Sequence, residues 1–342
     1  MAPLALTVLF LASIALALGA SEVLVRGLDR LGAQLHLQEG LLGLLTAIGA
    51  DAPEVSSALL AVSAGHGDLG LGVVFGSNVF NLAALLGLGA VVAGHVRVRR
   101  IGLGLNGGVV LATTLLVAGL MIGILSPPVT IALVVLVFVP YLIVLSLHPH
   151  QVAHLPLPGM VARLLATAVR EISHEERGLH AGATAEPAVR QGSGQWWRPL
   201  ILIVPALVVI ILASEGMVTA ALGLAVRWRL PNQLVGAVVL AGLTSLPNAY
   251  AAVRLALQQR GSAVVSEAFN SNTINLVAGI CLPALFVNVA GAGPAERFDL
   301  FWLLAMTLVT IILLTRRRGL NRPGGILVIG LYVLFVLFAV RG

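Results

Sequence analysis

Two carboxylates interrupt an apolar stretch near the start of the chain. Asp51 and Glu54 stand in the segment AIGADAPEVSSALLAV, with Pro53 between them. Residues three apart share one face of a helix, so both carboxylates can contact one ion. On insertion scales, a carboxylate at the centre of a membrane helix costs about 2.5–3.5 kcal/mol, and such residues usually mark a functional site. The chemistry that they offer in this position is the binding of a cation.

Hydroxyl and amide side chains accompany the carboxylates in two distant parts of the chain. The oxygen-bearing residues that we expect at the site are Asp51, Glu54, Ser77, Asn78 and Asn81 from the first half, and Thr244, Ser245, Asn248, Glu267, Ser271, Asn272 and Asn275 from the second. This set contains no cysteine and no histidine. Oxygen ligands suit Ca²⁺ or Na⁺ and argue against Zn²⁺ or Cu⁺. The residue types therefore predict a site for a hard cation.

The two polar groups recur at a fixed interval. The stretch APEVSSALLAVSAGHGDLGLGVVFGSNVFNL begins at Ala52, and LPNAYAAVRLALQQRGSAVVSEAFNSNTINL begins at Leu246, 194 positions later. The matched pairs include Pro53 and Pro247, Ser77 and Ser271, Asn78 and Asn272, and Asn81 and Asn275. The triplet ASE at 20–22 also recurs at 213–215, one residue out of step. Apolar similarity alone would not align these residues without a gap, so we infer an internal repeat.

Composition assigns the chain to the membrane. Of its 342 residues, 58% are hydrophobic and 10% are charged, with a mean hydropathy of +1.02. In a soluble domain, about a quarter of the residues are charged. All 20 basic residues are arginines, and they do not form a basic face with interleaved aromatic residues, which argues against a nucleic-acid partner. The single cysteine, Cys281, excludes an intrachain disulfide framework.

A membrane-spanning helix needs about 20 mostly apolar residues, and on this basis we expect an all-α integral membrane protein with ten transmembrane helices. The expected spans are about 3–29, 38–64, 69–94, 103–124, 128–147, 199–226, 232–258, 263–289, 298–315 and 324–340. The first span has no positively charged start, so we expect it to be retained and not removed as a signal peptide.

Three segments follow from this count. Residues 1–147 hold the first five spans, 148–197 form a polar loop, and 198–342 hold the second five. Apolar residues at helical spacing within the loop predict an interfacial helix that lies on the membrane.

Arginine placement predicts the orientation. With ten spans, 16 of the 20 arginines fall on the side of the central loop. The positive-inside bias then makes that loop cytoplasmic and leaves both termini outside the cell membrane. Because five is odd, the second half enters the membrane in the opposite orientation, which makes the repeat an inverted one. Inverted repeats are typical of secondary transporters, and Pro53 and Pro247 can open a helix at the midplane of each repeat.

The motifs resemble a known family. GADAPE followed by GSNVFN, and TSLPN followed by NSNTIN, are similar to the paired α-repeats of the cation/calcium exchanger superfamily, which includes Na⁺/Ca²⁺ exchangers. The similarity covers nearly the whole chain and identifies it as a divergent prokaryotic-type member. It implies that a glutamate of each repeat, helped by Thr or Ser hydroxyls and carbonyls, binds Ca²⁺. Glu54 matches the first of these glutamates.

Several residues depart from the family pattern. Asn248 stands where the second glutamate is expected, and Ala50 and Asp51 replace the first Thr-Ser. Val73 replaces an asparagine of the first repeat, and Glu267 occupies the equivalent place in the second. The number of carboxylates is preserved or raised, so we expect a cation cage of different geometry.

We therefore expect a secondary antiporter, not an enzyme, that exchanges Ca²⁺ for Na⁺ or H⁺ by alternating access and needs no cofactor. Two carboxyl groups that share a dry site cannot both ionise cheaply, which favours H⁺ as the coupling ion. A non-coupled cation channel is the alternative. An intramembrane aspartyl protease using Asp51 is a remote one, because such enzymes pair a Tyr-Asp with a Gly-x-Gly-Asp and the sequence has no Tyr-Asp.

The expected partners are inorganic cations and the lipid bilayer, and the oligomeric state stays open. Glu22 and Glu215 lie in the equivalent first helices of the two repeats, as candidates for gates, for contacts between helices or for the site itself.

Overall fold

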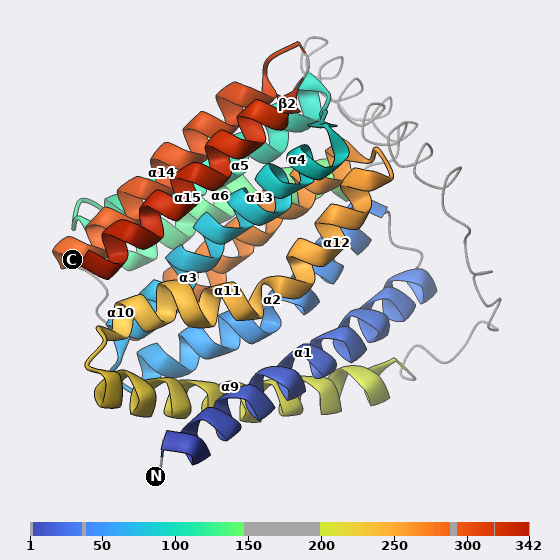
Figure 1. Cartoon of the computed structure of the whole chain (residues 1–342). Coiled ribbons are helices and arrows are strands. Elements are labelled where there is room, and N and C mark those ends of the chain that lie inside the picture. Colours follow the sequence, from blue (N-terminus) through green and yellow to red (C-terminus); the bar gives the residue numbers. More distant parts are fainter. Residues whose placement is uncertain (1–2, 36–38, 147–198, 288–292, 318, 342) are drawn as a thin grey trace.

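The computed structural model describes residues 3–35, 39–146, 199–287, 293–317 and 319–341 (Figure 1). The predicted interfacial helix, with the rest of the loop at 148–197, lies outside these residues. The helices of the first half are α1 (Pro3–Gln34), α2 (Glu39–Ser63), α3 (Gly67–Asn81), η1 (Leu82–Leu88), α4 (Gly89–Ala93), α5 (Arg100–Met121) and α6 (Pro127–Ser146). Those of the second half are α9 (Leu200–Trp228), α10 (Asn232–Leu234), η2 (Val235–Leu240), α11 (Ala241–Thr244), α12 (Leu246–Leu257), α13 (Gly261–Leu276), η3 (Val277–Cys281), η4 (Pro283–Leu285), α14 (Pro294–Leu314) and α15 (Arg322–Arg341).

Seven of the described helices are long and apolar enough to cross a membrane, or eight if α10–α11 and α12 count as one bent span. The seven are α1, the continuous helix α3–η1–α4, α5, α6, α9, α14 and α15. Neither α2 nor α13 is among them. These two helices hold the carboxylates Asp51, Glu54 and Glu267, and α13 has only 16 residues. That α2 and α13 cross the membrane, as the ten predicted spans require, therefore stays a prediction.

The polar helices lie at the centre of the molecule. In the most apolar window of α3–η1–α4, 94% of the residues are buried, whereas the value is 22% for α6 and for α15. Figure 1 shows α1 and α9 side by side along one edge, where both pack against α2. On the other side, α13 packs against α5, and α3 packs against α14. This arrangement encloses α2, α3, α11–α12 and α13 between two outer layers of apolar helices.

Glycines allow α3 to cross η2 with the two backbones in contact. A Cβ atom at Gly72 would lie 2.6 Å from the carbonyl oxygen of Gln233. A Cβ atom at Gly76 would collide with the backbone of Ala237, and one at Gly236 would collide with the carbonyl oxygen of Leu69. Gly72 and Gly76 are four residues apart, which is the spacing of small residues that brings membrane helices together.

The two prolines of the repeat have different effects. The prediction that a proline can open the helix is wrong for Pro53, because α2 runs unbroken from Glu39 to Ser63. A proline has no N–H, so the carbonyl of Gly49 loses its helical donor. The Ser21 hydroxyl of α1 donates to this carbonyl instead, at 2.8 Å. In the second repeat the helix does break, at Ser245, with a bend of 49°.

Two short strands depart from the all-α prediction. β1 (His95–Val96) pairs antiparallel with β2 (Leu320–Asn321), with His95 opposite Asn321 and Val96 opposite Leu320. The ribbon joins the end of α4 to the start of α15. Gly319 adopts φ +64°, and a Cβ atom there would collide with the carbonyl oxygen of Val96. Strands of two residues carry no periodic signal that a sequence could reveal.

Candidate functional site

Asp51 accepts hydrogen bonds from two helices of the second half. The Nδ2 atom of Asn248 on α12 lies 2.7 Å from its Oδ1, and the hydroxyl of Ser271 on α13 lies 2.8 Å from the same atom. All three side chains are buried, Asp51 completely. The carboxylate therefore joins α2 to both α12 and α13.

Glu54, one turn further along α2, makes an equivalent pair of contacts. The Ser245 hydroxyl, at the break between α11 and α12, donates to Oε1 at 2.5 Å. The Nδ2 atom of Asn275 on α13 donates to Oε2 at 2.8 Å. Glu54 has 1% of its surface exposed, so water does not solvate this carboxylate and its protein partners must do so.

Amides and hydroxyls of α3 and α13 extend the hydrogen bonds around each carboxylate into two neighbouring groups, one around Asp51 and one around Glu54. Asn81 donates to the Ser271 hydroxyl at 2.9 Å and to Asn272 Oδ1 at 3.2 Å. Asn275 lies 3.4 Å from the Ser77 hydroxyl. The central network is the set of Asp51, Glu54, Ser77, Asn78, Asn81, Ser245, Asn248, Ser271, Asn272 and Asn275. It brings together ten of the twelve residues predicted for the site.

The network is symmetric with respect to the two repeats. The side chain of Asn78 donates to the backbone carbonyl of Asn272 at 3.2 Å, and the side chain of Asn272 donates to the carbonyl of Asn78 at 3.1 Å. These residues are 194 positions apart, the interval of the sequence repeat. A reciprocal pair of this kind is what a pseudo-two-fold axis between two repeats produces.

Two further pairs of contacts obey the same rule. In the repeat, Asp51 corresponds to Ser245 and Asn248 corresponds to Glu54. The contact of Asp51 with Asn248 therefore has its equivalent in the contact of Ser245 with Glu54. The same correspondence relates the contact of Asn81 with Ser271 to that of Asn275 with Ser77. The internal repeat of the sequence therefore reappears in the hydrogen bonds that hold the centre together.

The centre has an excess of oxygen atoms without donors. Five buried side-chain oxygens here accept no hydrogen bond from any described residue: Asp51 Oδ2, Asn78 Oδ1, Asn81 Oδ1, Glu267 Oε2 and Asn275 Oδ1. Each buried acceptor without a partner costs about 1–3 kcal/mol. All five are acceptors, so a cation, and not a further acceptor group, is the species that would satisfy them.

Two predicted residues lie outside the network. The Thr244 hydroxyl bonds back to the carbonyl of Leu240, at 2.9 Å, within its own helical segment. Glu267 is on α13, one turn before Ser271, and its Oε2 is buried without a partner among the described residues. The described residues also contain no group of three His, Cys, Asp or Glu side chains that could hold a metal ion. Glu267 therefore does not complete a cluster of three carboxylates with Asp51 and Glu54.

The departures from the exchanger pattern at positions 51 and 248 are in direct contact. A changed cage is predicted because the expected acid is missing at Asn248 and an additional one is present at Asp51. In the structure, the side chains of these residues share a hydrogen bond of 2.7 Å. The acid missing at position 248 is thus matched by an acid in contact with it, and the network has two carboxylates, both on α2.

Sequence reasoning did not anticipate a second polar cluster. The Tyr141 hydroxyl on α6 lies 2.7 Å from Asn106 Oδ1 on α5 and 2.6 Å from Asn270 Oδ1 on α13. Asn270 also lies 3.3 Å from the Ser266 hydroxyl. Its partners come from three helices, and no spacing within the sequence relates them. The sequence likewise marks Ser21 only as part of a repeated triplet and does not reveal its hydrogen bond to the Gly49 carbonyl.

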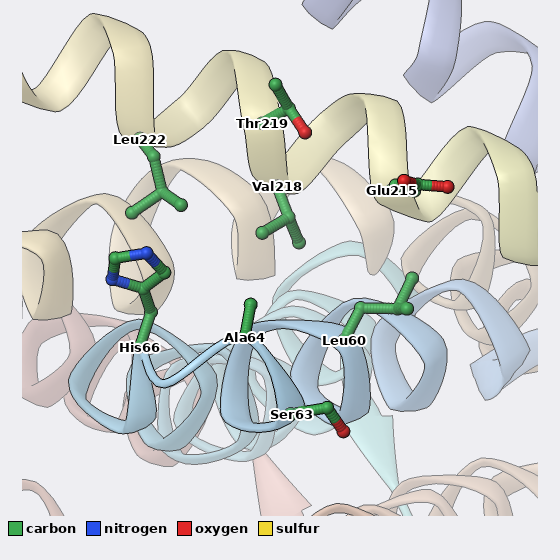
Figure 2. Close-up of a pocket in the computed structure, with 8 residues that line it drawn as sticks. All are labelled: Leu60, Ser63, Ala64, His66, Glu215, Val218, Thr219 and Leu222. Carbon is green, nitrogen blue, oxygen red and sulfur yellow. The ribbon is translucent and has the colours of Figure 1, made fainter.

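A cavity of about 370 Å³ lies between α2 and α9, beside the network (Figure 2). Its lining consists of Leu60, Ser63, Ala64, His66, Glu215, Val218, Thr219 and Leu222. His66 follows the end of α2, at the end of the molecule opposite the β1–β2 ribbon. The wall of the cavity includes the helix that carries Asp51 and Glu54.

Comparisons with known proteins extend over both halves. The sequence model of the family described as "Sodium/calcium exchanger protein" matches residues 5–148 and 198–341. The putative antiporter CaxA of Alkalimonas amylolytica is 38% identical over 88 residues, which is 25% of this chain and 28% of that protein. Sodium/potassium/calcium exchanger 4 of Homo sapiens is 35% identical over 83 residues, 24% of this chain and 13% of that protein. The chain thus spans less than a third of the length of either relative.

A solved structure matches the whole chain. The sodium-calcium exchanger NCX_Mj, soaked with 10 mM Na⁺ and zero Ca²⁺, superposes with a TM-score of 0.61 at 20% identity. The match covers 98% of this chain and 99% of that chain. At this level of identity, the likeness is one of fold.

Proposed function

Because this chain belongs to the sodium/calcium exchanger protein family, we propose that it is a secondary antiporter that moves Ca²⁺ across a membrane in exchange for H⁺. The protein acts as a transporter of inorganic cations, without enzymatic activity or a cofactor. By the positive-inside bias, the central loop is cytoplasmic and both termini are outside. Ca²⁺ and the coupling ion compete for the central network as it is exposed to each side in turn.

The observation that carries this proposal is the set of four buried oxygens without donors in the central network, on Asp51, Asn78, Asn81 and Asn275. Ca²⁺ takes six to eight oxygen ligands from carboxylates, amides and backbone carbonyls. The network offers carboxylates and amides, and Pro247 has no N–H, so the backbone carbonyl of Leu243 lacks its usual helical donor. Two carboxylates balance the double charge of one Ca²⁺ ion.

The preference for H⁺ over Na⁺ rests on Asp51. The family resemblance implies hydroxyl groups at positions 50 and 51, and hydroxyl oxygens can bind Na⁺ without changing their charge. This chain has Ala50 and a carboxyl group at Asp51 instead. A carboxyl group that shares a dry site with a second one can take up a proton when Ca²⁺ leaves.

The coupling ion is tested by uptake of radioactive calcium into proteoliposomes under either an imposed pH gradient or an imposed Na⁺ gradient. We expect the pH gradient to drive uptake and the Na⁺ gradient to have no effect of its own. Robust uptake driven by Na⁺ and indifferent to pH would overturn H⁺ coupling and leave a Na⁺/Ca²⁺ exchanger. Uptake that persists without any counter-gradient, and without exchange, would favour a cation channel.

Exchanging the two side chains in contact tests whether the acid has moved across the hydrogen bond. Asp51→Asn should slow exchange at least about tenfold, because the network loses one of its two carboxylates. Asn248→Asp should also slow it, because two carboxylates would then share the 2.7 Å contact. The double variant restores one acid and one amide. We expect its initial rate of calcium uptake to recover to within about threefold of the original.

The two single variants serve as the controls in this double-mutant cycle. Their effects on the initial rate should not multiply in the double variant, since residues in contact are not additive. A double variant as slow as the product of the singles would show that the two positions do not act on one ion.

A further inference from the structure

Glu215 is a carboxylate at mid-height of an apolar helix. It lies near the middle of α9 (Leu200–Trp228), its side chain is exposed, and it is part of the second copy of the repeated triplet ASE. A carboxylate at this depth that faced hydrocarbon would cost several kcal/mol. The cavity between α2 and α9 removes this problem, because Glu215 lines it (Figure 2). Water must therefore reach Glu215 through the cavity.

The cavity continues to the end of α9. A second hollow of about 650 Å³ is lined by Leu6, Thr219, Leu222, Gly223, Val226 and Arg227. Thr219 and Leu222 line both hollows, so the two hollows adjoin along α9. Arg227 is 12 residues from Glu215, about 18 Å along the helix. Over that distance, salt largely screens its charge.

The inner end of the cavity lies against the helices of the central network. Ser214, next to Glu215 in sequence, is buried, and its hydroxyl lies 3.5 Å from the carbonyl oxygen of Pro53. Pro53 directly precedes Glu54 on α2. The same helix supplies Leu60 and Ser63 to the cavity wall. A cation at Glu215 is thus separated from the network only by the interface of α2 with α9.

We propose that Glu215 is a capture site for hydrated cations, distinct from the central network and placed before it on the path from this side of the membrane. The carboxylate holds a hydrated divalent cation in the cavity until the ion passes between α2 and α9. Among the described lining residues Glu215 is the single carboxylate, and Ser63 and Thr219 supply the hydroxyl groups of the wall. A charge between low-dielectric walls raises the local concentration of oppositely charged ions. This role rests on the proposed function.

Glu22 provides a matched comparison. It occupies the equivalent place in the first ASE triplet, on α1, and its side chain is 60% exposed. Its Oε1 forms an ion pair with Arg26 at 3.0 Å, and it is not among the described residues that line the cavity. Removing its charge should leave the cation concentration in the cavity unchanged.

The test is the calcium dependence of uptake from the cavity side, in vesicles of defined orientation. For Glu215→Gln we expect the half-saturating Ca²⁺ concentration to rise about tenfold at low ionic strength, with the maximal rate unchanged, and the difference to shrink at high ionic strength. Glu215→Asp, which keeps the charge, and Glu22→Gln should behave like the original chain. An unchanged half-saturating concentration, or a lost maximal rate as at a residue of the central network, would overturn the proposal.

A second measurement does not depend on transport, so it separates this proposal from the proposed function. Thr219→Cys places a thiol one turn from Glu215 in the cavity, and the native Cys281 is fully buried. The introduced thiol at position 219 is modified by a cationic and by an anionic methanethiosulfonate. The ratio of the two modification rates reports the local electrostatic potential. We expect this ratio to fall about tenfold when Glu215→Gln is added, as one charge about 6 Å away implies. An unchanged ratio would show that Glu215 does not set the potential of the cavity.

Discussion

Glu54→Gln is expected to abolish calcium exchange while the protein still folds. Both oxygens of Glu54 accept hydrogen bonds, from Ser245 at 2.5 Å and from Asn275 at 2.8 Å. Glutamine has the same shape and can keep one of these bonds, but it removes one of the two negative charges that balance Ca²⁺. Since charge-assisted contacts are about twice as strong as neutral ones, we expect the initial rate of calcium uptake to fall about a hundredfold or more.

The matched control for this variant is Glu296→Gln, which removes the same charge in the first turn of α14, outside the central network. Its uptake should equal that of the original chain. Size-exclusion chromatography in detergent should show both variants as folded protein. Uptake at the original rate by Glu54→Gln would remove this residue from the site and, with it, the proposed two-carboxylate cage.

Gly76→Ala is expected to have the largest effect on stability. The added methyl group would collide with the carbonyl oxygen and the Cα atom of Ala237, both of which belong to the backbone of η2. Backbone atoms cannot rotate away as a side chain can, so α3 and η2 would have to separate. Overpacking in a well-packed core costs about 1–3 kcal/mol, and we expect the upper end of this range or more here. The measurement is the midpoint of thermal unfolding in detergent.

Gly108→Ala on α5 is the control, because a Cβ atom there meets nothing within 4 Å. This change should leave the unfolding midpoint unchanged or raise it, since alanine favours the helix over glycine by about 1 kcal/mol. Equal midpoints for Gly76→Ala and Gly108→Ala would contradict the close contact of α3 with η2.

The sequence contained enough to predict the membership of the central network. Asp51 and Glu54 share a helix face, and the repeat interval of 194 positions assigns their partners to equivalent places in the second half. Spacing along one helix and symmetry between two halves are both properties that a sequence carries. The hydrogen bond between Asp51 and Asn248 could not be predicted in this way, because it is a contact between two different helices.

The place of Glu267 at the site stays a prediction. Glu267 is four residues before Ser271, so the two share a face of α13, and the sequence analysis places both in the cage. One turn of helix is a displacement of about 5.4 Å along the axis, however, which is larger than the reach of a hydrogen bond. Glu267 therefore lies on the same face of α13 as Ser271, but one helical turn away along the axis.

Ser21 could not be predicted for another reason. The sequence does show that Pro53 leaves the carbonyl of Gly49 without its helical donor. It does not show which of the other helices supplies a replacement, and the Ser21 hydroxyl of α1 does so. The same limit applies to the cluster around Tyr141, whose members come from three helices. The π-helical turns η1, η2 and η3 likewise have no signature in the order of residues.

The hydrogen bond between Asp51 and Asn248 also affects how the ancestry of such chains is traced. An alignment scores each column separately, so position 248 registers the loss of an acid, and position 51 registers an unrelated gain. Across the 2.7 Å contact, however, the two positions are adjacent side chains, and a negative charge on either one lies at nearly the same place. What a lineage inherits at this place is then a pair of touching residues. Related chains that carry the acid at position 51 and those that carry it at position 248 can be grouped together only when the two alignment columns are compared jointly.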